Sequence, residues 1–298
     1  MAASLRDYWA RRAPAQTFLY AVGALLVLWG IAHLGVFFVD GGPWDGPVSW
    51  RKPVTFGVSF GVTALAVAFV ATFLSLGRRS SWLLLGSFGV ASALEVLWVS
   101  VQRWRGVPSH FAKEGLDAAL FFSAGLTIGV IGLVLVVVNV LAMRRLDAPP
   151  SMALAIRAGL VLLLVGQVLG GAIIANGNAI DRLPTEAELA VFGAAGAMKV
   201  PHAVALHAIE VLPALAWVLG FASPGEGRRR FLVAVGAAGY AALVPASAAQ
   251  TFAGLAPLDL AWPGAVLALV GLAGLAGAWA AALAQLCHGG VVEPALSG

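Results

Sequence analysis

Eight long apolar segments follow one another along this chain, and each is long enough to cross a lipid bilayer as a helix. The hydrocarbon core of a bilayer takes about 20 apolar residues of helix. Charged residues make up only 11% of the chain, against about 25% in soluble domains. We therefore predict an all-α, polytopic membrane protein in which one domain, residues 1–298, forms a bundle of about eight transmembrane helices. The predicted helices cover residues 16–39, 53–76, 81–102, 118–143, 154–176, 201–222, 230–253 and 262–287.

Positive charges indicate how the bundle is oriented. The 18 lysine and arginine residues lie in short clusters between the apolar segments, and most fall in alternate linkers. Loops rich in these residues remain cytoplasmic. This pattern predicts an inner (plasma) membrane protein with cytoplasmic N- and C-termini and membrane lipids around it. The same pattern argues against a nucleic-acid partner, despite the net charge of +4.

Polar residues inside the predicted helices lie mostly toward the predicted outer face. Ionisable groups at membrane depth are costly and usually face a cavity or a partner. Their uneven distribution predicts a polar pocket that opens outward and takes a small-molecule ligand from that side. These residues are His33, Glu95, Gln102, Gln167, Asn176, His202, His207, Glu210 and Gln250.

The segment KVPHAVALHAIEVLP, residues 199–213, has the densest group of polar side chains. His207 and Glu210 are three residues apart and can touch on one helix face. His202 lies about 7.5 Å of helix rise from His207, so the two histidines do not easily share one ion. Pro213 removes a backbone donor and is expected to kink the helix.

Four interpretations of these residues remain open. The first is haem b or a divalent metal with a redox or related enzymatic role. His33, His202 and His207 are the candidate ligands, with His33 opposed to one of the other two, and Glu210 and Glu95 would be the catalytic or proton-handling groups. The second is a proton-coupled transporter of a small solute. The third is a buried polar network with a structural role, and the fourth is an intramembrane hydrolase with a metal-bound water.

Two predicted outer loops carry cations and tryptophans. Arg51 and Lys52 follow the first, and Arg103 and Arg105 begin the second. We expect these four residues to bind an anion at the mouth of the pocket: an acidic ligand, a haem propionate or a lipid head group. The third outer loop is expected to hold a short helix over 184–195.

Small residues within the helices are expected to serve packing. Glycine allows two helices to approach closely, which assigns this role to Gly166, Gly170, Gly236 and Gly239. Ser59 lies in an apolar helix and is expected to pack in the same way.

Overall fold

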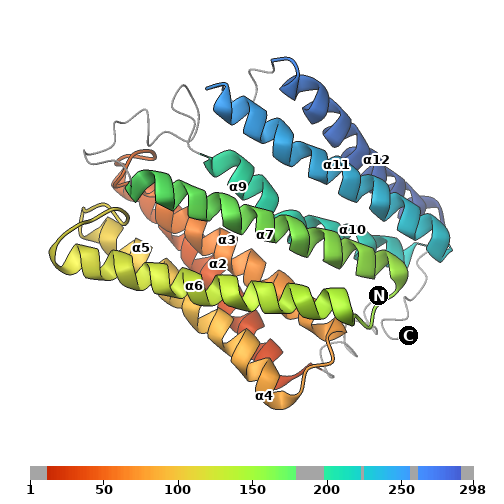
Figure 1. The fold of residues 1–298 in the computed structure, drawn as a ribbon, viewed down its shortest axis with the longest axis horizontal. Helices are drawn as coiled ribbons and strands as arrows, with labels where there is room; N and C mark the ends of the chain where they lie inside the picture. Colours follow the sequence, from red (N-terminus) through yellow and green to blue (C-terminus); the bar gives the residue numbers. More distant parts are fainter. Residues whose placement is uncertain (1–11, 179–197, 223–224, 256–260, 290–298) are drawn as a thin grey trace.

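The computed structural model describes residues 12–178, 198–222, 225–255 and 261–289, and in these residues every regular element is a helix. Eight spans are long and apolar enough to cross a membrane, which confirms the predicted all-helical, multi-pass architecture (Figure 1). The elements are α2 (Pro14–Asp40), α3 (Arg51–Val70) with the turn η1 (Ala71–Phe73), α4 (Arg78–Ser81), the π-turn η2 (Trp82–Gly86), α5 (Ser87–Trp104), α6 (Gly115–Arg144), α7 (Pro150–Asn178), α9 (Lys199–Leu206), α10 (Ala208–Phe221), α11 (Glu226–Phe252) and α12 (Gly264–Gly289).

Most helices extend a few residues beyond the apolar segments that predicted them. For example, α3 begins at Arg51 and α6 begins at Gly115. The reason is that polar and small residues at the bilayer surface continue the helical hydrogen bonding. The predicted span 201–222 differs most, because His207 divides it into α9 and α10. The predicted helix over 184–195 lies outside the described residues.

The spans form two groups. In the first group α2, α3, α5 and α6 pack together, and in the second α7, α9, α10, α11 and α12 do so. The groups meet where α6 packs on α7 and α3 packs on α10, a boundary that we call the seam (Figure 1). We name the two ends of the bundle after their linkers. The Trp50 end holds linkers 41–50 and 105–114, and the Arg144 end holds linker 145–149.

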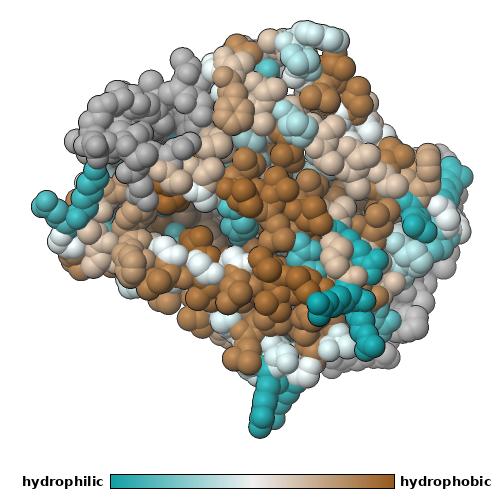
Figure 2. Space-filling view, viewed as in Figure 1, coloured by the Kyte–Doolittle hydropathy of each residue, from teal (hydrophilic) through white to brown (hydrophobic). Residues whose placement is uncertain are grey.

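The interior of the bundle is apolar and centres on α10. Its side chains Ile209, Leu212, Leu215 and Leu219 are each at most 1% exposed and pack with residues of α7 in one core cluster. Large apolar side chains also cover much of the outside, as expected for helices that can cross a membrane. Figure 2 shows hydrophobic residues across the middle of one face and hydrophilic residues toward its margins.

Glycines bring α2 and α3 into backbone contact. A Cβ on Gly57 would lie 2.7 Å from the backbone nitrogen of Gly30, and one on Gly61 would lie 2.7 Å from the carbonyl oxygen of Gly23. The predicted packing role of Gly239 is also confirmed, since a Cβ there would lie 2.7 Å from the carbonyl oxygen of Gly271. The pairs α2–α3 and α11–α12 are therefore held by close van der Waals contact.

Adding one methyl group between α2 and α3 is expected to destabilise the protein. Gly57→Ala forces the two backbones apart, and overpacking of this kind costs about 1–3 kcal/mol. The measurement is the thermal unfolding midpoint in detergent. Gly35→Ala on α2 is the matched control, because a Cβ there meets nothing within 4 Å. Equal midpoints for the two variants would contradict the close contact.

Candidate functional site

His207 and Glu210 contact α3 across the seam. Nε2 of His207 lies 3.2 Å from the hydroxyl oxygen of Ser59, and Thr63 donates a 2.9 Å hydrogen bond to Oε1 of Glu210. Nδ1 of His207 lies 3.5 Å from Oε2 of Glu210, so the predicted pair does come together. Ser59 and Thr63 are four residues apart on α3 and present their hydroxyls on one face. We call these four side chains the seam cluster.

The break between α9 and α10 positions this cluster. His207 has φ −83° and ψ 7°, and it separates the two helices. Pro213, from which we predicted a kink, lies inside α10. A proline disturbs the turn before it, and the break falls just beyond that turn. The break also creates a helix start within a membrane span. Glu210 lies in the first turn of α10, where the helix dipole favours negative charge.

The seam cluster is incompletely hydrogen-bonded. The side chain of Glu210 is 19% exposed and that of His207 is 35% exposed. Oε2 of Glu210 is buried and has no hydrogen-bond partner among the described residues. A buried unpaired acceptor costs about 1–3 kcal/mol. This oxygen is therefore a place where the cluster can accept a proton or a further ligand.

His202 faces α7. Its Nδ1–H group donates a 2.7 Å hydrogen bond to the carbonyl oxygen of Gly166. Gly170 leaves room for the ring, since a Cβ there would lie 2.7 Å from Cε1 of His202. On the other side, Tyr240 of α11 donates a 2.9 Å hydrogen bond to the carbonyl oxygen of Val204. The short helix α9 is thus anchored to both α7 and α11.

His33 belongs to an aromatic cluster at the Trp50 end of the first group. It is 4% exposed. Its Nδ1–H group donates a 2.9 Å hydrogen bond to the carbonyl oxygen of Trp29, and its Nε2 accepts a 3.1 Å hydrogen bond from the indole of Trp104. Both ring nitrogens are therefore engaged within the protein.

The remaining predicted pocket residues are distributed over several helix contacts. Glu95 of α5 is 2% exposed and accepts a 2.7 Å hydrogen bond from Thr127 of α6, a contact inside the first group. Gln250 is buried on α11 next to the start of α12, and Gln167 is half-buried on α7. Asn176 lies in α7, but its side chain is outside the described residues.

Arg51 and Lys52 lie at the Trp50 end. Arg51 pairs with Asp45 at 3.0 Å. The ammonium of Lys52 donates to the carbonyl oxygen of Pro47 at 2.7 Å and to the hydroxyl of Ser109 at 3.3 Å, which ties two linkers together.

The other two predicted anion ligands are paired within the protein. The guanidinium of Arg103 lies 3.7 Å from the centroid of the Trp50 ring, and Asp40 is its nearest carboxylate at 3.9 Å. Arg105 binds Asp117, and it also donates a 2.6 Å hydrogen bond to Oε1 of Gln102. The carboxamide of Gln102 donates in turn to Asp117 at 3.1 Å.

Sequence reasoning missed three residues of this region. Ser59 and Thr63 were not placed in the pocket, although their spacing of four residues on an otherwise apolar helix is a usable signal. Lys199 was also missed. It is the first residue of α9 and lies near enough to Arg51 and Lys52 to interact electrostatically with both.

The residues fit haem b or a metal ion poorly. A haem iron held between facing helices needs imidazoles with a free nitrogen, and both nitrogens of His33 are engaged. In residues 12–178, 198–222, 225–255 and 261–289, no group of three or more His, Cys, Asp or Glu side chains is placed to hold a metal ion. The cofactor therefore stays a prediction from sequence.

Comparisons with known families, with curated proteins and with solved structures find no match. The residues themselves are thus the basis for a functional proposal.

His110 lies at the Trp50 end, where its ring packs against aromatic side chains of α3 and α6. Its ring centroid lies 5.9 Å from that of Phe56, 6.0 Å from Phe111 and 5.9 Å from Phe121. Burial, followed by the positive charges of Lys52 and Lys199, lowers the pKa of His110 to about 3. The folded protein therefore keeps this imidazole neutral.

Acid is expected to weaken the fold through His110. The pKa of this group is lower in the folded state than its ordinary value of 6.5, so its contribution to stability is complete above pH 6.5 and is lost as the pH falls toward 3. Thermal unfolding between pH 7 and pH 4 should show a steeper decline for the wild type than for His110→Gln. Parallel curves would contradict this role.

Proposed function

We propose that the chain is a proton-coupled carrier of a small anionic solute, and that the seam cluster handles the proton. The observation that carries the proposal is the contact of His207 and Glu210 with Ser59 and Thr63 across the seam. Intramembrane ionisable residues commonly mark substrate or proton pathways. Transporters often place such groups on broken helices between two bundles that move against each other.

Protonation of the seam cluster would change the hydrogen bonds that cross the seam. Oε2 of Glu210 has no hydrogen-bond partner among the described residues, so a proton there lies beside Nδ1 of His207 at 3.5 Å. A proton on either group changes which of them donates and which accepts. The hydrogen bonds of Ser59 and Thr63 must then rearrange, and these hydroxyls belong to the other half of the bundle.

The cations at the Trp50 end favour an anionic solute. Arg51, Lys52 and Lys199 interact electrostatically with one another, and Asp45 is their acidic neighbour. Clustered charge of one sign raises the local concentration of ligands of the opposite sign. We therefore propose that Arg51 and Lys52, together with Lys199, attract the anion to this end of the bundle.

We infer that the Trp50 end faces outward and that both termini are cytoplasmic in the plasma membrane, which agrees with the arginine-rich linkers at the Arg144 end. The test uses a Cys287→Ser background with a single new cysteine. Glu114→Cys should react with an impermeant thiol reagent from outside intact cells, and Ser80→Cys only after permeabilisation. The reverse pattern would overturn the orientation.

Removal of the Glu210 carboxylate should abolish coupled transport. The assay is proteoliposomes that contain a pH-sensitive dye and receive a panel of small carboxylates and inorganic phosphate under a pH gradient. We expect proton movement with at least one anion for the wild type, and loss of at least tenfold for Glu210→Gln. Glu114→Gln on the exposed linker is the control and should retain the wild-type rate.

Two outcomes separate the alternatives. If no anion moves protons in the wild type, the carrier proposal fails. If His207→Ala lowers the unfolding midpoint and leaves transport unchanged, the seam cluster is a structural network.

The transition-metal site predicted from the sequence is the weaker alternative, because His207 and Glu210 are only two possible ligands and no group of three is found in the described residues. Metal analysis and the absorption spectrum of protein from supplemented cultures test it. Stoichiometric metal or a haem band that is lost in His207→Ala would support it, and metal-free, colourless protein would remove it.

A further inference from the structure

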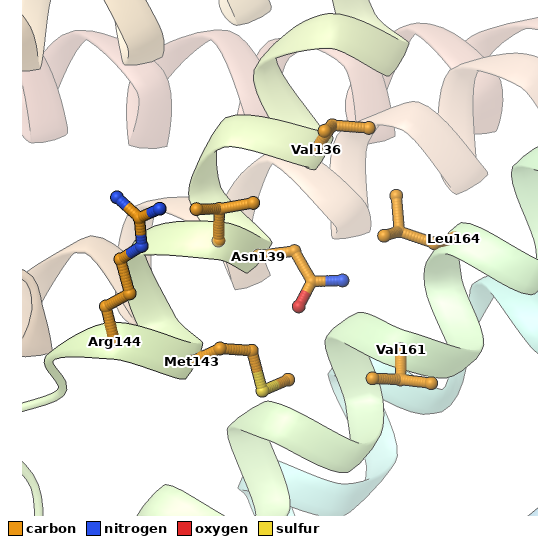
Figure 3. Close-up of a pocket in the computed structure, with 7 residues that line it drawn as sticks. Val136, Asn139, Met143, Arg144, Val161 and Leu164 are labelled. Atoms are coloured by element: carbon orange, nitrogen blue, oxygen red, sulfur yellow. The ribbon is translucent and has the colours of Figure 1, made fainter.

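A groove runs between α6 and α7 toward the Arg144 end, away from the seam cluster and the cations of the Trp50 end. Its volume is about 390 Å³. Most of its walls are apolar, and the two exceptions are Asn139 and Arg144 (Figure 3). The apolar residues that matter here are Val136, Met143, Val161 and Leu164.

Asn139 is the unexplained group of this groove. It is only 7% exposed, and its Oδ1 atom is buried with no hydrogen-bond partner among the described residues. Figure 3 shows its carboxamide in the space between α6 and α7, facing Val161 and Leu164. Neither of these side chains has a donor. An amide in an apolar membrane helix is costly without a partner, so Asn139 marks this groove as a place where a hydrogen-bonding ligand can bind.

We propose that the groove binds an anionic glycerophospholipid. The walls of the groove continue onto the lipid-facing surface, where Val136 is 47% exposed, Met143 is 42% exposed and Val161 is 46% exposed. An acyl chain is the apolar molecule that this surface meets in a membrane. The occupant is therefore drawn from the bilayer itself.

The charge of the arginines near the groove and the depth of Asn139 indicate which kind of lipid would bind. Arg144 lines the groove and is exposed, and Arg145 beside it is exposed as well. Two guanidinium groups at a helix end attract a phosphate, which arginine binds through paired hydrogen bonds. Asn139 lies five residues earlier on α6, about 7.5 Å deeper. An ester carbonyl lies below the phosphate of a glycerophospholipid, so at that depth the amide N–H of Asn139 can donate to it.

Native mass spectrometry of the detergent-solubilised protein tests this site. The probes are dioleoylphosphatidylglycerol and dioleoylphosphatidylcholine, which carry the same acyl chains. We expect the wild type to bind the glycerol lipid more tightly. Asn139→Leu keeps the size of the side chain and removes the amide, and it should weaken that binding about fivefold to tenfold, the effect of one or two hydrogen bonds.

The arginine variants give an independent readout. Arg144→Gln should reduce the preference for the anionic lipid, whereas Arg230→Gln, an exposed arginine near the same end of α11, should leave it unchanged. Equal binding of the two lipids, or no effect of Asn139→Leu in protein that elutes as the wild type does, would overturn the proposal. A disulfide-linked dimer of Val140→Cys in a Cys287→Ser background, formed in native membranes, would overturn it too and make a second copy of the chain the occupant.

Discussion

Hydrocarbon provides no hydrogen bonds, so every polar group inside a bilayer must find its partner within the protein. The contacts of this chain follow from that requirement. The buried His33 uses one ring nitrogen to donate and the other to accept. Arg105, Gln102 and Asp117 satisfy one another. Oε2 of Glu210 and Oδ1 of Asn139 are among the few buried side-chain atoms without a hydrogen-bond partner in the described residues, and both proposed sites are built on them.

The fold was largely predictable because length and hydropathy alone decide whether a segment spans a bilayer. All eight predicted spans occur as helices, with ends shifted by a few residues. The break at His207 was not predicted at its position. A proline indicates that a helix is disturbed, but the residue that absorbs the distortion depends on neighbours, and here α7 and α11 hold α9 independently.

From the sequence, contacts between site residues were predictable only where both residues lie on the same helix. The contact of His207 with Glu210 follows from their spacing. Contacts between helices depend on which faces meet, and a single sequence does not contain that information. For this reason the sequence placed His33 opposite His202 or His207, without indicating its contacts with Trp29 and Trp104, and Ser59 and Thr63 were overlooked. Likewise, the cations of the two loops were all expected to be available for an anion, whereas Arg51, Arg103 and Arg105 each lie within 4 Å of a carboxylate of the protein.

The glycine contact between α2 and α3 has a mechanical consequence. With backbones separated by little more than van der Waals distance at Gly57 and Gly61, neither helix can tilt or slide without the other. Ser59 lies between these two glycines on α3. If protonation changes the hydrogen bonds of His207, as proposed, the change at Ser59 would act on α2 and α3 as one unit.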